Sequence, residues 1–141
     1  MPEEITIRCK ALTDEIVALQ RLIENGTTGK NEISLFIGGR EYLVKLSDVL
    51  FFETDAGGGV CAHTRSNIFD SDKNLSELSK ELPDVFARVS KSCILNTQAV
   101  YSMSRGITGV CEVSFAGTDK KAYVSRMYYR NFREILNEKR L

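Results

Sequence analysis

The chain has 141 residues, of which 43% are hydrophobic and 27% charged. This composition is ordinary for a globular protein, and the length is enough to bury one core. No apolar run is long enough to span a membrane, and the N-terminus, MPEEITIRCK, has acidic residues where a secretion signal would be basic. We therefore expect a cytoplasmic protein with no direct membrane insertion.

Charge is balanced over the whole chain but divided unevenly along it. The sequence has 19 basic and 19 acidic side chains. Residues 1–85 hold 9 basic and 15 acidic side chains, a net charge of −6, while residues 86–141 hold 10 basic and 4 acidic, a net charge of +6. This asymmetry predicts a basic face that attracts DNA. The alternative is that the two halves pair with each other in the fold.

Metal and enzyme chemistry have little support in the sequence. Four cysteines, at positions 9, 61, 93 and 111, form no Cys-x-x-Cys pair, and His63 is the only histidine. Zinc needs four ligands at suitable spacing, so we expect no metal and no cofactor. Without a nucleophile motif or clustered carboxylates we also expect no enzyme. The cysteines should be free thiols; a redox role is the less favoured alternative, with Cys93 as its candidate.

The first thirty residues predict a strand followed by a helix. Residues 4–9 alternate apolar and polar side chains, which is typical of a strand. Residues 12–24 then place four apolar side chains on one helical face, namely Leu12, Ile16, Leu19 and Ile23. Asn25 and Gly26 end the helix. We expect this helix either to pack within its own monomer or to form a dimer interface.

From residue 31 the pattern becomes β-rich. Predicted strands are residues 33–37, 41–46, 49–54, 60–64, 67–69, 100–103, 110–115 and 121–124. Gly38 and Gly39 predict a hairpin turn, and residues 106–109 predict another. Two helices are expected, one at residues 74–82 and one that starts at Arg126 or Met127 and continues to the C-terminus. Many short strands without a βαβ rhythm predict a mostly antiparallel β protein, α+β by content.

The segment FARVSKSCILN, residues 86–96, alternates like a strand but is unusually rich in hydrogen-bond donors. Such donors suit phosphate oxygens and base edges. In a regular strand Arg88, Ser90 and Ser92 would lie on one face and Lys91 on the other. They can share one surface only if the segment bends. For Asn96 we favour a bond to the backbone at a turn.

Four pieces in this order resemble the LytTR family of bacterial DNA-binding domains. They are LSDVLFFE at 46–53, the leucines of the helix at 75–82, FARVSKSCILN at 86–96, and VSR at 124–126. The resemblance covers residues 31–138. It implies elongated stacked antiparallel sheets with short helices in a DNA-binding domain at residues 31–141. Residues 1–30 then form an N-terminal strand-helix extension, and the protein is response regulator-like but has no receiver domain.

The resemblance implies that Lys91 and Arg126 reach DNA bases. A lysine or arginine can donate to the acceptors of guanine, and the arginine fork can do so with two bonds. The alternatives are a solvated Lys91 on an edge strand and an Arg126 that pairs with Glu112. Further DNA contacts, mainly to phosphates, are expected from Arg88, Ser90, Ser92 and Arg130.

The loop after the strand at 49–54 departs from the family pattern, which often places a long polar side chain there. Here the loop holds Asp55 and three glycines, residues 57–59. Gly58 and Gly59 could let the backbone come close to a phosphate, whereas Asp55 would repel it. We expect a DNA contact at these two glycines.

The sequence thus predicts a DNA-binding transcription regulator that recognises repeated sites in double-stranded DNA, as a homodimer at least on DNA. The family resemblance adds a membrane protein as a regulatory partner. The alternative is a β-scaffold interaction module whose basic face binds an acidic protein, with the helix at residues 12–23 as dimer interface. Steep salt dependence distinguishes DNA binding from an apolar protein interface.

Overall fold

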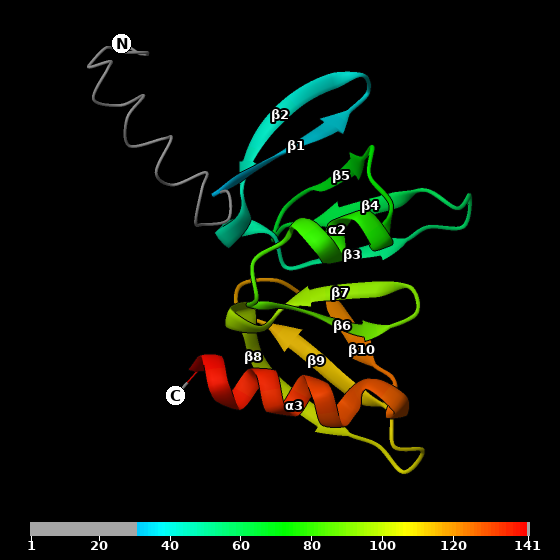
Figure 1. The fold of residues 1–141 in the computed structure, drawn as a ribbon, viewed down its shortest axis with the longest axis vertical. Coiled ribbons are helices and arrows are strands. Elements are labelled where there is room, and N and C mark those ends of the chain that lie inside the picture. The colour runs from blue at the N-terminus through cyan, green and yellow to red at the C-terminus, as the bar shows by residue number, and fades with distance from the viewer. Residues whose placement is uncertain (1–30, 141) are drawn as a thin grey trace. The chain divides into compact units, whose positions relative to one another are not determined.

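A computed structural model describes residues 31–140, which form two antiparallel sheets and two α-helices (Figure 1). The strand and helix predicted for residues 1–30 lie outside the described residues. The larger sheet has seven strands in the order β2-β1-β5-β4-β3-β7-β6, and the smaller has the order β10-β9-β8. The prediction of a mostly antiparallel β fold is confirmed.

The elements follow the predicted order with small shifts at their ends. The strands are β1 (Glu32–Ile37), β2 (Arg40–Lys45), β3 (Phe51–Thr54), β4 (Val60–His63), β5 (Ile68–Ser71), β6 (Phe86–Ser90), β7 (Cys93–Asn96), β8 (Val100–Arg105), β9 (Cys111–Phe115) and β10 (Lys121–Val124). The helices are η1 (Leu46–Asp48), α2 (Leu75–Glu81), η2 (Thr97–Ala99) and α3 (Arg126–Arg140). In the described residues no helix is long and apolar enough to cross a membrane.

The turn between β1 and β2 is the one predicted from its two glycines. Gly38 has φ 56° and Gly39 has φ 83°. A two-residue hairpin turn with positive φ at both positions matches the twist of the flanking strands, and glycine adopts it without steric cost. These two residues therefore fix the register in which Leu35 faces Tyr42.

The donor-rich segment is a hairpin, so the expectation of a single strand over residues 86–96 is wrong. β6 and β7 pair with each other, and Lys91 and Ser92 form the turn between them. The register shifts between Arg88 and Ser90, which leaves Val89 as a bulged residue. The segment bends at Lys91 and Ser92, which meets the condition under which its donors could share one surface.

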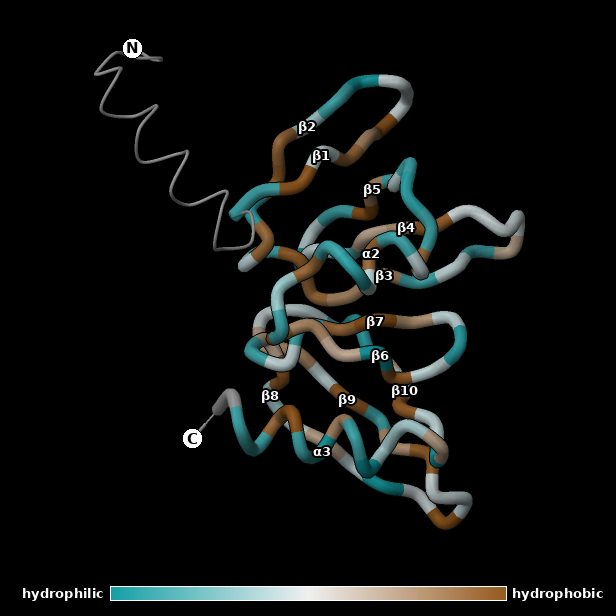
Figure 2. The backbone as a smooth tube through the Cα atoms, in the orientation of Figure 1, coloured by the Kyte–Doolittle hydropathy of each residue, from teal (hydrophilic) through white to brown (hydrophobic). Residues whose placement is uncertain are grey.

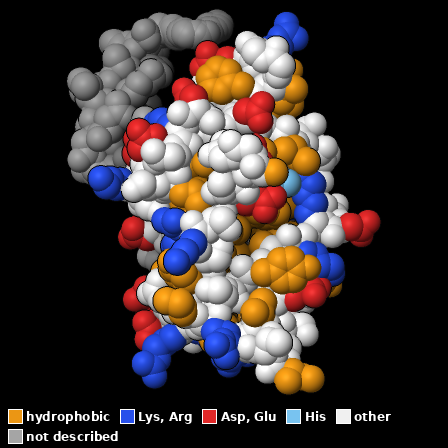
Figure 3. Space-filling model, turned by 90° about the vertical axis from the view of Figure 1, so that its right-hand side faces the viewer, with side chains coloured by type: hydrophobic (Ala, Val, Ile, Leu, Met, Phe, Trp, Pro, Cys, Tyr) orange, Lys and Arg blue, Asp and Glu red, His pale blue; other side chains and the backbone are white. Residues whose placement is uncertain are grey.

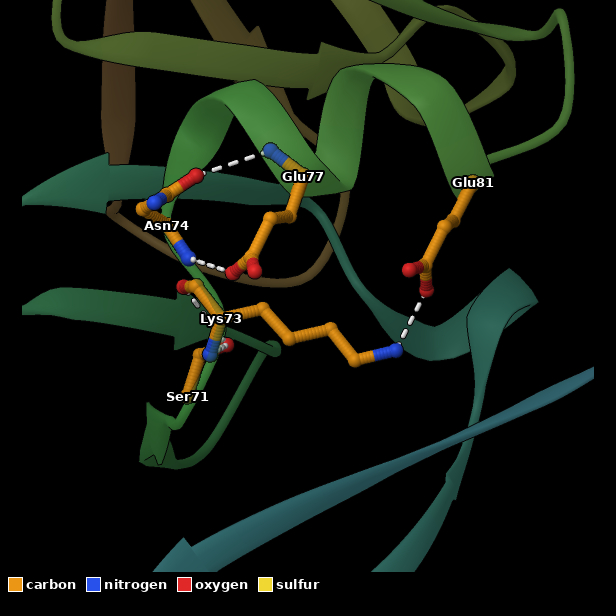
Figure 4. A network of polar contacts seen from close by, with 5 residues as sticks. All are labelled: Ser71, Lys73, Asn74, Glu77 and Glu81. Carbon is orange, nitrogen blue, oxygen red and sulfur yellow. Dashed lines mark hydrogen bonds and ion pairs between the residues drawn. The ribbon is translucent and has the colours of Figure 1, made fainter.

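Helix α2 begins with a capping box, which explains the helix entry predicted at residue 74 (Figure 4). The Asn74 side chain accepts the N–H of Glu77 at 2.8 Å, and the Glu77 carboxylate accepts the N–H of Asn74 at 2.9 Å. Lys73 forms an ion pair with Glu81 along the same side of the helix. Side chains of the helix itself thereby accept hydrogen bonds from N–H groups of its first turn.

Two cores lie on opposite faces of the seven-stranded sheet, and hydrophobic stretches of the tube in Figure 2 follow its strands. Runs such as VLFF at 49–52 are continuously apolar because their residues are divided between the two cores, with Val49 and Phe52 in one and Leu50 and Phe51 in the other. The helix-side core, under α2, consists of Leu35, Val49, Phe52, Val60, Ala62, Phe69, Leu75, Leu78 and Ile94. The inter-sheet core, shared with the smaller sheet and α3, consists of Leu50, Phe51, Ala87, Val89, Cys93, Leu95, Val100, Cys111, Val113, Phe115, Ala122, Val124, Phe132 and Leu136.

Two turns tie the sheets together by hydrogen bonds from basic side chains. Arg65 Nε, in the β4–β5 turn, donates to the carbonyl of Ala116 at 2.7 Å. In the opposite direction Lys120 Nζ donates to the carbonyls of Thr64 and Asn67, both at 2.8 Å. Burial lowers the pKa of Lys120. These two cations therefore help to hold the two sheets together.

His63 packs as an aromatic core residue. Its ring stacks on Phe51 with centroids 4.4 Å apart, and Phe51 in turn stacks on Phe115 of the smaller sheet. Burial lowers the pKa of His63 below its ordinary value of 6.5, although Glu53, 3.0 Å from Nε2, acts to raise it. The neutral ring thus joins the stacking between the two sheets.

Candidate nucleic-acid interface

Four connections between elements reach the same edge of the described structure, on the right in Figure 1. They are the β3–β4 loop (residues 55–59), the β6–β7 turn (Lys91 and Ser92), the β8–β9 turn (residues 106–110) and the β10–α3 junction (Ser125 and Arg126). We call this the loop edge. It brings together residues that lie far apart in the sequence.

Backbone hydrogen bonds hold three of these connections in fixed relation. The N–H of Thr54, just before the β3–β4 loop, donates to the carbonyl of Ser92 at 2.9 Å. The N–H of Ser125 donates to the carbonyl of Val89 at 2.8 Å. Because Val89 is the bulged residue of β6, its carbonyl can leave the strand ladder and accept this bond. The turn that carries Lys91 and the junction that carries Arg126 are thereby joined through the backbone.

Lys91 is exposed at the tip of its turn, and the turn is held from behind by Arg88. The Arg88 guanidinium donates to the carbonyl of Ser90 at 2.9 Å and to the carbonyl of Lys91 at 2.7 Å. A third donor lies 3.4 Å from the Ser79 hydroxyl. Three of the five donors of the guanidinium are therefore used within the fold. This geometry indicates that the main role of Arg88 is to hold the turn, because few of its donors remain for a phosphate.

The two serines of this hairpin differ in role, because Ser90 stabilises the turn and Ser92 is exposed on it. The Ser90 hydroxyl accepts the N–H of Ser92 at 3.2 Å, which stiffens the turn. Ser92 is exposed and its hydroxyl lies 3.5 Å from that of Ser90.

Asn96 is buried; its Nδ2 donates to the carbonyl of Val49 at 3.1 Å and its Oδ1 accepts the N–H of Gln98. The expectation that Asn96 bonds the backbone at a turn is confirmed.

Arg126 is exposed and is the first residue of α3. Glu112, the partner considered for it in the alternative interpretation, instead pairs with Lys121 at 3.1 Å. A cation in the first turn of a helix opposes the helix dipole, and no acidic residue compensates for it there. A residue placed against local preference at an exposed position is typical of a functional site. The helix N-terminus itself favours an anion such as phosphate.

Arg130 and Arg105 extend this basic region. Arg130 is exposed one turn further along α3. Arg105, which was not expected from the sequence, is exposed at the end of β8 and lies with its guanidinium 4.1 Å from the centre of the Tyr129 ring. Such a cation–π contact orients the guanidinium without neutralising its charge. The sequence feature that could have pointed to Arg105 is its position directly before the glycine turn that starts at Gly106.

The β3–β4 loop is closed around Asp55. Its Oδ1 accepts the N–H groups of Gly57 at 2.9 Å and Gly59 at 3.0 Å, and its carbonyl accepts the N–H of Gly58 at 3.0 Å. The donors that a backbone contact to phosphate would use are therefore already engaged within the loop. Gly58 has φ 90°, and a Cβ added to it would meet no atom within 4 Å. A contact here would depend on close approach.

The cysteines near the loop edge are poorly suited to a redox role. Burial raises the pKa of Cys93 to about 12. Burial, together with a hydrogen bond to Asp55, raises the pKa of Cys61 to about 11. Since the reactive form is the thiolate, both side chains are unreactive near neutral pH. This supports the expectation that they pack as small apolar groups.

Figure 3 looks onto the loop edge and shows Lys and Arg side chains interspersed with Asp and Glu side chains. The charge asymmetry of the sequence had suggested a basic face, but this face carries both signs of charge. Attraction of a polyanion here would depend on particular cations at the ends of loops rather than on the net charge of the surface.

Comparisons with known proteins identify the family of the chain and support its fold. A model of the LytTr DNA-binding domain matches residues 39–137. An uncharacterized HTH-type transcriptional regulator from Staphylococcus aureus (strain bovine RF122 / ET3-1) is 26% identical over 133 residues, which cover 94% of this chain and 88% of that protein. A solved LytTr DNA-binding domain from Bacillus cereus shares the fold, with a TM-score of 0.70 at 22% identity, over 77% of this chain and 98% of that one.

The HTH label of the staphylococcal relative does not describe the architecture seen here. Within residues 31–140, α2 and α3 are separated by the five strands β6 to β10. A helix-turn-helix needs two helices joined by a short turn. The helices α2 and α3 therefore do not form a helix-turn-helix.

Proposed function

The chain belongs to the LytTr DNA-binding domain family, and we propose that its loop edge recognises double-stranded DNA as part of a transcription regulator. The observation that carries this proposal is the backbone link between Val89 and Ser125, because it holds Lys91 and Arg126 on one edge. Two donors on separate loops, fixed relative to each other, can contact bases at a constant spacing.

We propose distinct roles for the basic side chains. Lys91 and Arg126 contact base edges, as their exposure and their place at loop ends allow. Arg105, Arg130 and Ser92 contact phosphates and set the register. Arg88 and Ser90 act indirectly by holding the β6–β7 turn.

For the β3–β4 loop we propose a weaker contribution. Gly58 and Gly59 permit close approach of the backbone to phosphate, but the N–H groups of both already bond within the loop. The loop then contributes shape rather than hydrogen bonds. This end of the interface should read less sequence than the end that carries Lys91 and Arg126.

Assembly and regulation follow as further parts of the proposal. We propose that two copies bind a repeat as a dimer on DNA, since the symmetry of a dimer matches that of a repeated site. We place the protein in the cytoplasm, where its DNA target lies. The family resemblance supports a membrane protein as the partner that regulates it. Residues 1–30, as an extension to the DNA-binding domain of residues 31–141, are the proposed site of assembly.

Selection of bound sites from random duplex DNA, followed by a salt titration, tests the proposed function. If three or four phosphates are contacted, the slope of log K against log salt should be about −2.7 to −3.6. The rival protein-interaction module predicts no enriched sequence and a shallow slope. That result would contradict the proposal.

Asp55 offers a test of the β3–β4 loop. Asp55→Asn keeps an oxygen that can accept the N–H groups of Gly57 and Gly59, but removes a negative charge beside the proposed DNA path. We expect DNA affinity to rise by about two- to fivefold at low salt, with the gain shrinking as salt screens the charge. The matched control is Asp119→Asn, an exposed aspartate in the β9–β10 turn. Equal effects of the two variants would show that the loop lies away from DNA.

A further inference from the structure

The β8–β9 turn presents a backbone without a side chain to the stem of Arg126. Gly109 has φ 91°, and a Cβ at this position would lie 2.4 Å from Cδ and 2.7 Å from Cγ of Arg126. Carbon atoms in contact lie about 3.5–4.0 Å apart. The observed position of Arg126 therefore requires glycine at 109 for two reasons, the left-handed backbone and the absence of a Cβ.

The turn that bears Gly109 is itself braced. The N–H of Gly109 donates to the carbonyl of Gly106, and the N–H of Gly106 to the carbonyl of Val110, both at 3.0 Å. Arg105 Nε lies 3.3 Å from the carbonyl of Gly109, and the Arg105 guanidinium rests on Tyr129 of α3. Gly109 is thus held from β8 and from α3, the helix on which Arg126 sits.

A braced contact of this kind restricts the rotamers of an otherwise free surface arginine. A flexible arginine must be ordered when it binds, which lowers both affinity and selectivity. An arginine whose methylene stem already lies against a rigid turn has lost part of that freedom beforehand. Its guanidinium then starts from a restricted position at the loop edge.

We propose that Gly109 is a positioning residue that sets the sequence selectivity of DNA binding by seating Arg126. The inference rests on the proposed function, since it takes Arg126 as the side chain that reads a base. Gly109 itself touches no DNA in this account. Its effect should appear only through Arg126.

The test is Gly109→Ala in the full chain, measured on the selected operator duplex and on a scrambled duplex. Operator affinity should fall by about five- to a hundredfold, the range for loss of one bidentate arginine contact. Affinity for the scrambled duplex should change by less than about twofold, because phosphate contacts remain. Operator affinity within twofold of the unaltered protein would overturn the proposal.

Two alanine variants control for other effects of the substitution. Gly39→Ala imposes a similar backbone cost, at φ 83°, in a hairpin where nothing lies within 4 Å of the added Cβ. Gly106→Ala lies in the same turn as Gly109, and its Cβ would meet only the Val110 carbonyl at 3.8 Å. Gly39→Ala should match Gly109→Ala in thermal stability yet keep its selectivity, and Gly106→Ala should keep both. Loss of selectivity in either control would contradict the proposal that Gly109 positions Arg126.

A double-mutant cycle with Arg126→Ala separates this inference from the proposed function. Gly109→Ala should add no further loss of operator affinity once Arg126 is alanine. A loss that persists in the Arg126→Ala background would overturn the seat alone and leave the role of Arg126 in place. If Arg126→Ala by itself leaves operator affinity unchanged, the proposed base contact fails, and the seat fails with it.

Discussion

Replacing Lys91 or Arg126 with alanine is expected to weaken operator binding by about 1–3 kcal/mol each while the protein stays folded. Both side chains are exposed at loop ends, so their removal leaves no cavity and no unpaired buried group. The loss should be concentrated on operator DNA, because base contacts distinguish sequences and phosphate contacts do not.

Titration of each variant against operator and scrambled duplexes measures this difference. Arg130→Ala, which removes a proposed phosphate contact, should weaken both complexes alike and make the salt slope shallower by about 0.9. Lys45→Ala, an exposed lysine of β2 outside the loop edge, is the control for a general loss of positive charge. Unchanged operator affinity in both the Lys91 and Arg126 variants would sink the assignment of the loop edge.

Local sequence signals accounted for most of the fold because several of them are self-contained. The glycine pair at 38 and 39 defines its hairpin within two residues. The capping box of Asn74 and Glu77 defines the start of α2 within four. Each of these signals carries its own steric or hydrogen-bonding reason, so no long-range contact is needed to interpret it.

The β6–β7 turn was missed because the features that define it are not those of a standard two-residue turn. Lys91 and Ser92 are not the glycine or asparagine that two-residue turns favour. The turn instead depends on the bulge at Val89 and on the Arg88 fork that binds two turn carbonyls. Alternating apolar residues continued through the segment, so the period alone indicated one strand.

The candidate site depends on a contact between residues far apart in the sequence as well as on local residue types. The residue types of Lys91 and Arg126 pointed to them, but their juxtaposition depends on the hydrogen bond from Ser125 to Val89. The sequence also suggested a DNA contact for Arg88, whereas three of its donors are used inside the fold. Arg105 and Gly109 were missed because their roles depend on contacts with Tyr129 and Arg126 of α3, which the sequence does not show.

The attachment of α3 gives the largest expected stability effect. Phe132 is fully buried in the inter-sheet core, to which both sheets contribute side chains. Phe132→Ala should lower the free energy of unfolding by about 3–5 kcal/mol, since it removes a large apolar side chain and leaves a cavity. Against a total stability of about 5–15 kcal/mol, this is a large share. Urea denaturation at constant pH measures it.

Met127→Ala on the same helix is the matched control, because Met127 is 84% exposed and its loss should change stability by less than about 0.5 kcal/mol. Operator binding by Phe132→Ala should fall only in proportion to the unfolded fraction, since Arg126 keeps its seat in every folded molecule. That separates an attachment defect from the loss of a base contact, in which folded protein binds weakly. A cost below about 1 kcal/mol would mean that α3 is not packed on the inter-sheet core, and the position of Arg126 would then need another explanation.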